Sequence, residues 1–253
     1  MSRHIVITGA SAGFGQALAR MVAREPASFR LSVGARRVDR LAEFAQKAFC
    51  ARLDVTATAS CDEFLAAATE RNGPVDVLVN NAGLARGVEK VAEADGKAWR
   101  EMIETNVVGV LNMTRRVLPA MITRKDGHVV MLGSVAGHEA YEGGSVYCAT
   151  KRALQSIAQA IRLETLGSNI RVTSVDPGLA ETEFSVVRFS GDAARAKKVY
   201  EGTRALSAED VADVIHFAIT RPPHVNLDVI VIKPTDQAAV GKVYRAVPQQ
   251  KPL

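Results

Sequence analysis

The chain has 253 residues, of which 47% are hydrophobic, and it carries a formal charge of +5 with a pI of about 9.2. This length allows one large α/β domain or two small ones, and the absence of any run of 18 apolar residues argues against a membrane-spanning segment. Basic residues are mixed with acidic ones without aromatic interleaving, so we expect attraction for small anionic ligands and no nucleic-acid partner.

Short β-rich runs alternate with longer amphipathic runs along the chain. Several of the short runs are almost continuously apolar, as expected for parallel strands buried on both faces. This alternation predicts a single α/β domain over residues 1–253, built on a Rossmann-type doubly wound parallel sheet of about seven strands. The predicted strands cover residues 4–8, 30–35, 49–55, 75–81, 128–134, 170–176 and 228–233, and the predicted helices lie near 13–24, 37–47, 57–72, 97–123, 144–166 and 208–218.

Two segments do not fit the regular alternation. The stretch from Pro177 to about Tyr200 is predicted to be an unusually long loop, and residues 178–200 are therefore a candidate substrate loop. The tail 246–253, "AVPQQKPL", is predicted to be irregular.

A glycine turn follows the first predicted strand. The stretch "ITGASAGFGQALARM" places Gly9, Gly13 and Gly15 between a strand and a helix, with the spacing GxxxGxG. Glycine there permits a tight turn and lets backbone N–H groups approach a pyrophosphate at the positive end of the helix. Such a turn can also be purely structural, but its position after the first strand favours a dinucleotide site.

The end of the second predicted strand indicates which dinucleotide. An acid at this position would bind the ribose 2′-OH of NAD, but the sequence reads "GARRVDRL", with Arg36 and Arg37. Two guanidinium groups suit a 2′-phosphate, and Ser11 could add a hydroxyl. We therefore predict NADP(H), although one of the two arginines could be a solvated helix start.

Further candidates follow the third and fourth strands. Asp54 could accept a hydrogen bond from the adenine amino group or could cap the next helix. The sequence "NNAG" at 80–83 ends the fourth strand, at the edge of the sheet where ligands bind in such folds, and could also be a structural turn.

The stretch "SVAGHEAYEGGSVYCATK" places Ser134 thirteen residues before Tyr147, and Lys151 four residues after it. Residues four apart lie on one helix face, so the phenol and the ammonium can meet. We expect the ammonium and a nearby positive nicotinamide to lower the pKa of Tyr147, which would let it exchange a proton with an alcohol or alkoxide. Ser134 could hydrogen-bond the same substrate oxygen, and Lys151 could bind the nicotinamide ribose.

The motifs "TGASAGFG", "NNAG", "SVYCATK" and "PGLAET", in this order, resemble those of the short-chain dehydrogenase/reductase family over essentially the whole chain. The resemblance implies an oxidoreductase with Ser134, Tyr147, Lys151 and Asn106 as catalytic residues, Asn106 holding a water that connects to the lysine. It also implies a homotetramer, with helices near 97–123 and 144–166 at an interface. Residues and resemblance together predict cofactor contacts from Gly9, Ser11, Gly13, Phe14, Gly15, Arg36, Arg37, Asp54, Val55, Asn81, Ala82, Gly83, Tyr147, Lys151, Pro177, Gly178 and Thr182.

Longer strings, such as "PGLAETEFSVVRFSGD", resemble a branch of the family that acts on small anionic substrates. This branch contains NADP-dependent 3-hydroxy acid dehydrogenases, acting on serine, L-allo-threonine and 3-hydroxypropionate-like acids, and also sulfoacetaldehyde reductases. The first activity is our main prediction; a sulfoacetaldehyde or other small-aldehyde reductase is the alternative, and a non-catalytic NADP sensor is a third. Candidate substrate residues are Arg188, which could clamp an anion, with Tyr141, Phe184 and Gln237. Arg86 would add positive charge if it faced the pocket.

The pattern of cysteines indicates whether the protein works in a reducing or an oxidising compartment. Cys50, Cys61 and Cys148 form no CxxC pair and no metal-ligand pattern, so we expect a reducing, cytoplasmic setting and no bound metal. The N-terminal "MSRHIVITGAS" reaches its glycine turn too soon to read as a signal peptide. Cys148 is expected to lie in the core.

Overall fold

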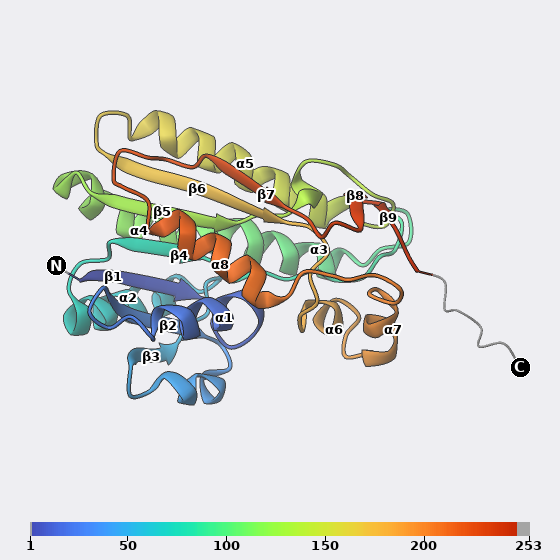
Figure 1. The fold of residues 1–253 in the computed structure, drawn as a ribbon, viewed down its shortest axis with the longest axis horizontal. Coiled ribbons are helices and arrows are strands. Elements are labelled where there is room, and N and C mark those ends of the chain that lie inside the picture. The colour runs from blue at the N-terminus through green and yellow to red at the C-terminus, as the bar shows by residue number, and fades with distance from the viewer. Residues whose placement is uncertain (1, 247–253) are drawn as a thin grey trace, which may run out of the picture.

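Seven parallel strands form the centre of the molecule (Figure 1). The computed structural model describes residues 2–246, and within this range the strands are hydrogen-bonded in the order β3-β2-β1-β4-β5-β6-β7. Each predicted strand overlaps an observed one, so the predicted doubly wound parallel sheet in a single α/β domain is confirmed. The strands are β1 Arg3–Thr8, β2 Phe29–Ala35, β3 Ala48–Arg52, β4 Val77–Asn80, β5 Gly127–Leu132, β6 Ile170–Pro177 and β7 Val229–Ile232.

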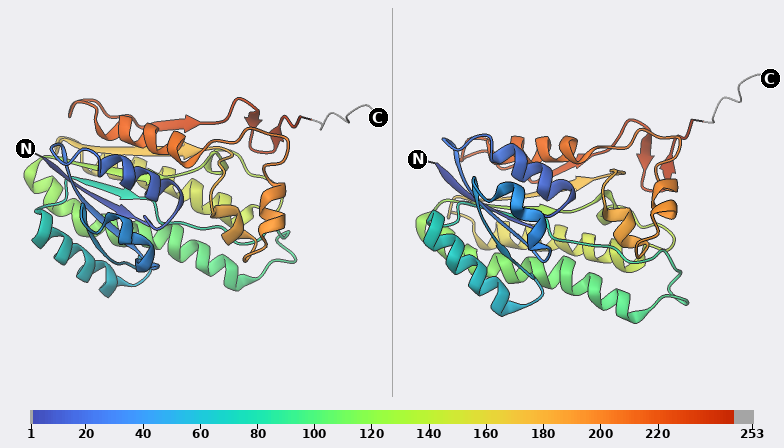
Figure 2. Two further views of the ribbon diagram at one scale, coloured as in Figure 1. Left: turned by 60° about the horizontal axis from the view of Figure 1, so that its bottom comes forward. Right: turned by 90° about the horizontal axis from the view of Figure 1, so that it is seen from below.

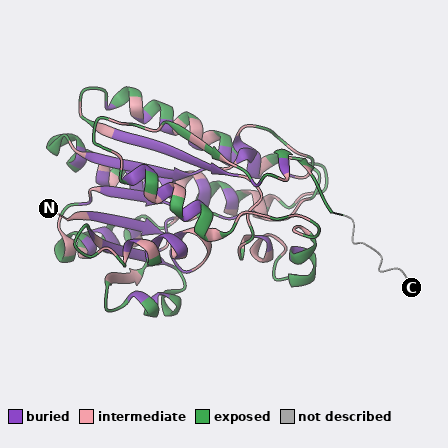
Figure 3. Ribbon diagram, in the orientation of Figure 1, coloured by how far each residue is buried: buried purple, intermediate pink, exposed green. Residues whose placement is uncertain are grey.

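Helices cover both faces of the sheet, and Figure 2 shows the two layers on either side of it. One layer holds α1 (Gly13–Val22), the 3₁₀ helix η1 (Val38–Phe44) and α8 (Ala208–Ile219); the other holds α2 (Thr58–Asn72), α4 (Gly109–Arg124) and α5 (Ser145–Glu164). The central strands are buried by both layers, which explains their continuous apolar runs (Figure 3).

The chain leaves neighbouring strands β1 and β4 toward opposite faces of the sheet. After β1 it enters α1, and after β4 it continues to the helices of the other layer. At such a switch point the loops after the strands diverge and leave a crevice at the carboxyl ends. The strand order therefore places a ligand cavity beside the glycine turn and the 80–83 turn.

The predicted helix 97–123 is divided in the structure. Residues Gly96–Ile103 form α3, residues Glu104–Val108 form a π-helical turn, η2, and α4 begins at Gly109. Hydrophobic periodicity cannot reveal one such wide turn, because the apolar pattern resumes after it. The predicted helix 37–47 is likewise replaced by the shorter 3₁₀ helix η1.

Residues 178–200 contain more regular secondary structure than the sequence indicates. The segment contains two short helices, α6 (Phe184–Arg188) and α7 (Ala193–Lys198), which Figure 1 shows at the carboxyl ends of the strands. The side chain of Asp192 caps α7 by accepting a hydrogen bond from the N–H of Arg195. The prediction of one long loop was therefore wrong for these two stretches, which are helical.

A short antiparallel pair, β8 (Gln237–Ala239) and β9 (Lys242–Val243), closes the described part of the chain. The sequence-based reading missed it because each strand has at most three residues. In the tail 246–253, residues 247–253 lie outside the described residues.

Candidate active site

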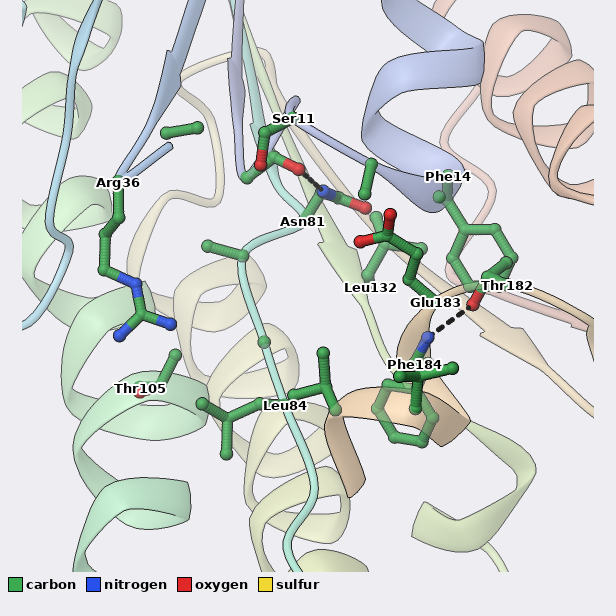
Figure 4. Close-up of a pocket in the computed structure, with 18 of the residues that line it drawn as sticks. Ser11, Phe14, Arg36, Asn81, Leu84, Thr105, Leu132, Thr182, Glu183 and Phe184 are labelled. Carbon is green, nitrogen blue, oxygen red and sulfur yellow. Dashed lines mark hydrogen bonds between the residues drawn. The ribbon is translucent and has the colours of Figure 1, made fainter. Parts of the chain in front are cut away.

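A cavity of about 810 Å³ lies at the carboxyl ends of the central strands. Every predicted cofactor-binding residue lines it except Gly15, which instead faces Asn81. Figure 4 shows Arg36 and Thr105 on one side of this cavity and Phe14, Thr182 and Phe184 on the other. The cavity is therefore elongated between the residues after β2 and those after β6.

The glycine turn and the 80–83 turn are in close contact. Gly9 has a φ of 69°, and a Cβ on it would lie 2.8 Å from the Cα of Ala82; a Cβ on Gly15 would overlap the Asn81 amide. Asn81 Nδ2 donates to the carbonyl oxygens of Thr8 at 2.8 Å and Gly9 at 3.1 Å. Glycine is required here for close backbone approach, so the turn is shaped by packing as well as by any ligand.

The start of α1 is suited to an anion. Its N-cap, Ala12, makes no side-chain capping bond, and the first turn carries no acidic residue. No side chain therefore uses the first N–H groups of the helix, and they can donate hydrogen bonds to a ligand. The positive end of the helix faces the cavity. Thr182 approaches from the opposite segment, with its Cβ 3.6 Å from the position of a Cβ on Gly13. This donor set and the room above it fit the pyrophosphate of a dinucleotide.

Three arginines lie near one end of the cavity. The guanidinium of Arg36 makes no hydrogen bond to another described residue (Figure 4). Arg37 and Arg40 both pair with Glu183, at 3.0 Å and 2.6 Å. Arg36 is thus the arginine of this group whose charge is not already paired by Glu183, which fits a 2′-phosphate.

Asp54 has a structural role in addition to its place in the cavity wall. Its Oδ1 accepts hydrogen bonds from the N–H and the hydroxyl of Thr56, at 3.1 Å and 2.8 Å, just before α2. Burial acts to raise the pKa of this carboxyl, but the hydrogen bonds from Thr56 together with the charges of Arg36 and Arg52 outweigh it, and the pKa is lowered. The carbonyl of the next residue, Val55, accepts from Asn112 at 3.0 Å. Asp54 therefore does not cap α2, whose N-cap is Ala57 without a side-chain bond; its carboxylate stabilises the turn before the helix instead.

Ser134, Tyr147 and Lys151 are brought together as predicted. Ser134 follows β5, and its hydroxyl accepts from the N–H of Ala136 at 3.1 Å. Tyr147 and Lys151 lie in the first two turns of α5 and are buried, with 9% and 7% of their surface exposed. All three residues line the cavity, so their phenol, hydroxyl and amine groups can contact the same bound ligand.

The ammonium of Lys151 does not pair with the phenol. Its Nζ donates to the carbonyl oxygen of Leu132 at 2.6 Å and lies 5.8 Å from the centre of the Tyr147 ring. Burial lowers the pKa of Lys151 to about 8, and Asp176 acts to raise it.

Burial raises the pKa of Tyr147, and Tyr141 adds to this effect, while the Ser134 hydroxyl and the Arg188 charge act in the opposite direction. The prediction that Lys151 lowers the pKa of the phenol is therefore wrong for the protein's own groups. The reason is that desolvation dominates and that the ammonium is directed at a backbone carbonyl.

Asn106 lies in the π turn η2 and is almost completely buried. Its Oδ1 accepts from the N–H of Leu84 at 2.9 Å, and its Nδ2 donates to the carbonyl of Leu84 at 2.8 Å and to Thr150 Oγ1 at 3.1 Å. A Cβ on Gly83 would lie 3.2 Å from Asn106 Oδ1 and 3.7 Å from Lys151 Nζ. Asn106 thus fixes the backbone after the 80–83 turn, beside the lysine.

Three of the four predicted substrate residues converge on Tyr147. The Phe184 ring lies 5.6 Å from the Tyr147 ring, and Phe184 lines the cavity. Arg188 donates to the Tyr141 hydroxyl at 2.8 Å and to the carbonyl of Gly87 at 2.9 Å. The α6 helix therefore places a cation and an aromatic ring near Tyr147, but Arg188 and Tyr141, unlike Phe184, are not among the residues that line the cavity.

Gln237 is placed elsewhere. It is buried, it does not line the cavity, and its Oε1 accepts from the N–H of Leu179 at 2.7 Å. A Cβ on Gly178 would overlap this side chain. The structure thus gives Gln237 a role in supporting the backbone after Pro177, because its carboxamide is already used there.

Arg86 lines the cavity, but its charge is paired. Its Nε and Nη2 each donate to Glu101 at 2.8 Å, and its Nη1 donates to the carbonyl of Val187 at 2.6 Å. The added positive charge that the sequence suggested is therefore neutralised. Cys148 is buried in a cluster that includes Leu84, in agreement with the core interpretation.

Sequence reasoning missed several cavity residues. Arg40 follows Arg36 by four positions and could have been found from helical spacing. Glu183 stands next to Thr182, but nothing in the sequence indicates its arginine partners. Thr105 enters the cavity through the unpredicted π turn, and Leu84, Leu132, Val186 and Val187 are apolar wall residues without a motif.

Within residues 2–246, no three His, Cys, Asp or Glu side chains are grouped so that they could hold a metal ion. In the same range, no helix has both the length and the apolar character needed to cross a bilayer. Cys50, Cys61 and Cys148 are free thiols.

A family model described as short chain dehydrogenase matches residues 3–192. A cavity at the carboxyl ends of a doubly wound parallel sheet, lined by Ser134, Tyr147 and Lys151, is the kind of place where dinucleotides bind in such folds. The chain belongs to the short-chain dehydrogenase family and is an oxidoreductase.

Named relatives are similar over nearly the whole chain. An NADP-dependent 3-hydroxy acid dehydrogenase of Schizosaccharomyces pombe is 41% identical, with 95% of this chain and 96% of the relative covered. A serine 3-dehydrogenase of Agrobacterium fabrum is 38% identical, with 97% and 99% covered. The closed form of a serine dehydrogenase complexed with NADP+ has a TM-score of 0.91 and 39% identity, with 96% and 99% covered.

Proposed function

We propose that the protein is an NADP(H)-dependent dehydrogenase of a small anionic 3-hydroxy acid. The observation that carries this proposal is the position of Arg188, a cation 5.7 Å from the ring of Tyr147; Tyr147 and the neighbours Phe184 and Val187 line the cavity that fits a dinucleotide, and Arg188 lies just outside that lining. A substrate whose hydroxyl reaches Tyr147 can then present an anionic head group to the guanidinium. The names of the relatives, which specify NADP and 3-hydroxy acids or serine, support the same reading.

NADP(H) would be held by residues that follow β1, β2 and β6 and by Lys151 of α5. The uncapped start of α1 and the glycine turn bind the pyrophosphate, and Arg36 binds the 2′-phosphate. Lys151 can bind ribose hydroxyls with the donors that Leu132 does not use, and Thr182 is placed across the turn from Gly13.

The bound cofactor supplies or accepts a hydride at the carbon that bears the hydroxyl. Tyr147 donates a proton to the substrate oxygen during reduction and removes it during oxidation. Because burial raises its pKa, the phenol is protonated at neutral pH, the form that reduction requires. Ser134 orients the substrate oxygen, while its hydroxyl and the Arg188 charge favour the phenolate that oxidation requires.

Lys151 and Asn106 act around the tyrosine. With a pKa of about 8, Lys151 is mostly an ammonium at pH 7, so it can return a proton toward Tyr147. Asn106 holds the Leu84 backbone and stands on the other side of Gly83, where it can keep a water in contact with Lys151.

The substrate is tested by initial rates of NADP+ reduction with L-serine, L-allo-threonine, 3-hydroxypropionate and isethionate, each repeated with NAD+. We expect turnover of the hydroxy acids with NADP+ and much slower turnover with NAD+. A preference for isethionate would favour the sulfoacetaldehyde reductase alternative, since a guanidinium binds sulfonate as well as carboxylate. No turnover of any of the four would contradict the proposed substrate class.

We also propose a cytoplasmic homo-oligomer, a tetramer by resemblance, in which α4 and α5 form an interface. These helices and α3 expose large apolar side chains, namely Ile103, Leu111, Ile122 and Leu163. Light scattering of the purified protein tests this; a monomer at micromolar concentration would contradict it.

A further inference from the structure

Asp176 has a carboxylate that is completely buried near the end of β6. Its Oδ1 accepts from Ser174 Oγ at 2.5 Å, and its Oδ2 accepts from His138 Nε2 at 2.5 Å and from Gln155 Nε2 at 3.2 Å. Among the described residues, no arginine or lysine lies within 4.0 Å of it. A charge removed from water is costly unless other groups compensate for it, so this carboxylate calls for an explanation.

The partners of Asp176 come from the elements that carry the proposed catalytic residues. His138 follows the short helix η3 (Val135–Gly137), whose N-cap is Ser134. Gln155 lies on α5, one turn after Lys151. The carboxylate therefore joins the Ser134 turn to the helix of Tyr147 and Lys151.

The end of β5 brings Asp176 close to Lys151. The Leu132 carbonyl accepts from Lys151 Nζ, and at the next residue a Cβ on Gly133 would overlap the Asp176 carboxylate. Glycine at 133 thus lets the carboxylate approach the backbone beside the group that holds the ammonium. Asp176 does not line the cavity, so it has no direct contact with a ligand there.

Few other charges face Lys151. Tyr147 is its titratable neighbour on α5, and His138, partly exposed, lies beyond Asp176. The π turn contributes the uncharged Thr105 and Asn106 on its buried side, and Glu104 faces solvent. On α6, the charged residue Arg188 lies 5.7 Å from the centre of the Tyr147 ring. Asp176 is therefore the anionic group available to balance a buried ammonium.

We propose that Asp176 is a positioning residue that keeps Lys151 in its ammonium form and fixes the Ser134 turn to α5. This inference rests on the proposed function, because it assigns Lys151 a charge that the reaction uses. Removing the negative charge should favour the neutral amine, since the lysine would remain buried without its counter-charge.

The test is Asp176→Asn, which keeps the size of the side chain and removes its charge. The protonation of Lys151 is followed by NMR of ¹³C-labelled lysine side chains in the full-length protein, with the signal assigned by its loss in Lys151→Met. We expect the titration midpoint of Lys151 to fall by about one pH unit. In the matched control, Ser174→Ala, a hydrogen bond is lost but the charge remains, so the midpoint should stay at the wild-type value.

A kinetic measurement accompanies the NMR titration of Lys151. In the reducing direction, the alkaline limb of kcat/KM should shift to lower pH in Asp176→Asn by the same amount as the NMR midpoint. If this variant does not fold, Asp176→Ser is examined in the same way. An unchanged titration midpoint of Lys151 in a folded variant overturns the inference, even if activity is reduced. Asp176 would then contribute only to packing and not to the charge of Lys151. The NMR readout needs no substrate, so failure of the substrate panel and failure of this inference are distinguishable.

Discussion

The guanidinium of Arg188 lies 5.7 Å from the centre of the Tyr147 ring. The two residues are 41 positions apart in the sequence, and they meet because α6 folds back over the start of α5. The pair places a positive charge next to the proposed proton donor. The effect of removing Arg188 can be measured, and so can the effects of changing Tyr147, Arg36 and the buried histidines.

Arg188→Ala should reduce kcat/KM for the preferred hydroxy acid by about 10- to 100-fold, since a hydrogen bond to a charged group contributes about 1.5–3 kcal/mol. The reduction should be small for a neutral alcohol of the same length. Tyr141→Phe is the matched control, because it removes the hydroxyl that contacts Arg188 and leaves the guanidinium. Equal losses for the charged and the neutral substrate would show that Arg188 is only structural.

Tyr147→Phe should reduce turnover by about 100- to 10,000-fold, because the phenol hydroxyl is the proposed proton donor and acceptor. NADPH affinity should stay near the wild-type value, since the ring that packs against Phe184 is preserved. Fluorescence titration with NADPH and steady-state rates measure the two quantities. Near-normal turnover would remove Tyr147 from the mechanism.

Arg36→Ala should weaken NADP+ binding at least about tenfold more than NAD+ binding, because a charge-assisted contact to the 2′-phosphate is lost. Arg37→Ala is the natural comparison. Its guanidinium is already paired with Glu183, so its loss should have the smaller effect. Calorimetric titration of both variants with both cofactors checks this, and a larger effect at Arg37 would reverse the assignment.

Protein stability should fall on acidification below about pH 6.5, because of two buried histidines. Burial lowers the pKa of His128, with the charges of Arg171 and Arg3 adding to the effect, and burial also lowers the pKa of His4. Each histidine is neutral in the fold but binds a proton when unfolded, so its contribution is complete above the unfolded pKa and is lost as the pH falls. The maximum slope is about 1.4 kcal/mol per pH unit for each histidine.

Urea unfolding between pH 7.5 and 5 measures this slope. His128→Gln should make it shallower, whereas His224→Gln, at an exposed position, should leave it unchanged. A His128→Gln slope equal to that of the wild type would mean that His128 does not contribute.

The sheet and the position of the site were predictable from local signals. Continuous apolar runs such as 129–132 mark strands buried on both faces, and glycines, strand ends and helical spacing mark what lies at one edge of the sheet. These features depend on residues close together in the chain, so sequence reasoning found them.

What was not predictable depends on distant contacts. Arg37 meets Glu183 across 146 positions, and the buried Gln237 meets Leu179 across 58. Lys151 turns to a backbone carbonyl, which no residue pattern records. The π turn at Asn106 and the helices within 178–200 were missed for a different reason: each has only five or six residues, too few for hydrophobic periodicity to mark.

The two arginine contacts of Glu183 have a consequence for how the protein responds to its medium. All three side chains are close to half exposed, so dissolved ions weaken their attraction, which is screened over about 8 Å at physiological ionic strength. The Asp176 carboxylate is enclosed, so its interactions are screened far less. Salt should therefore loosen the 178–200 segment from the arginines after β2 while leaving the environment of Lys151 unchanged. Ionic strength and pH thus act on separate parts of one enzyme.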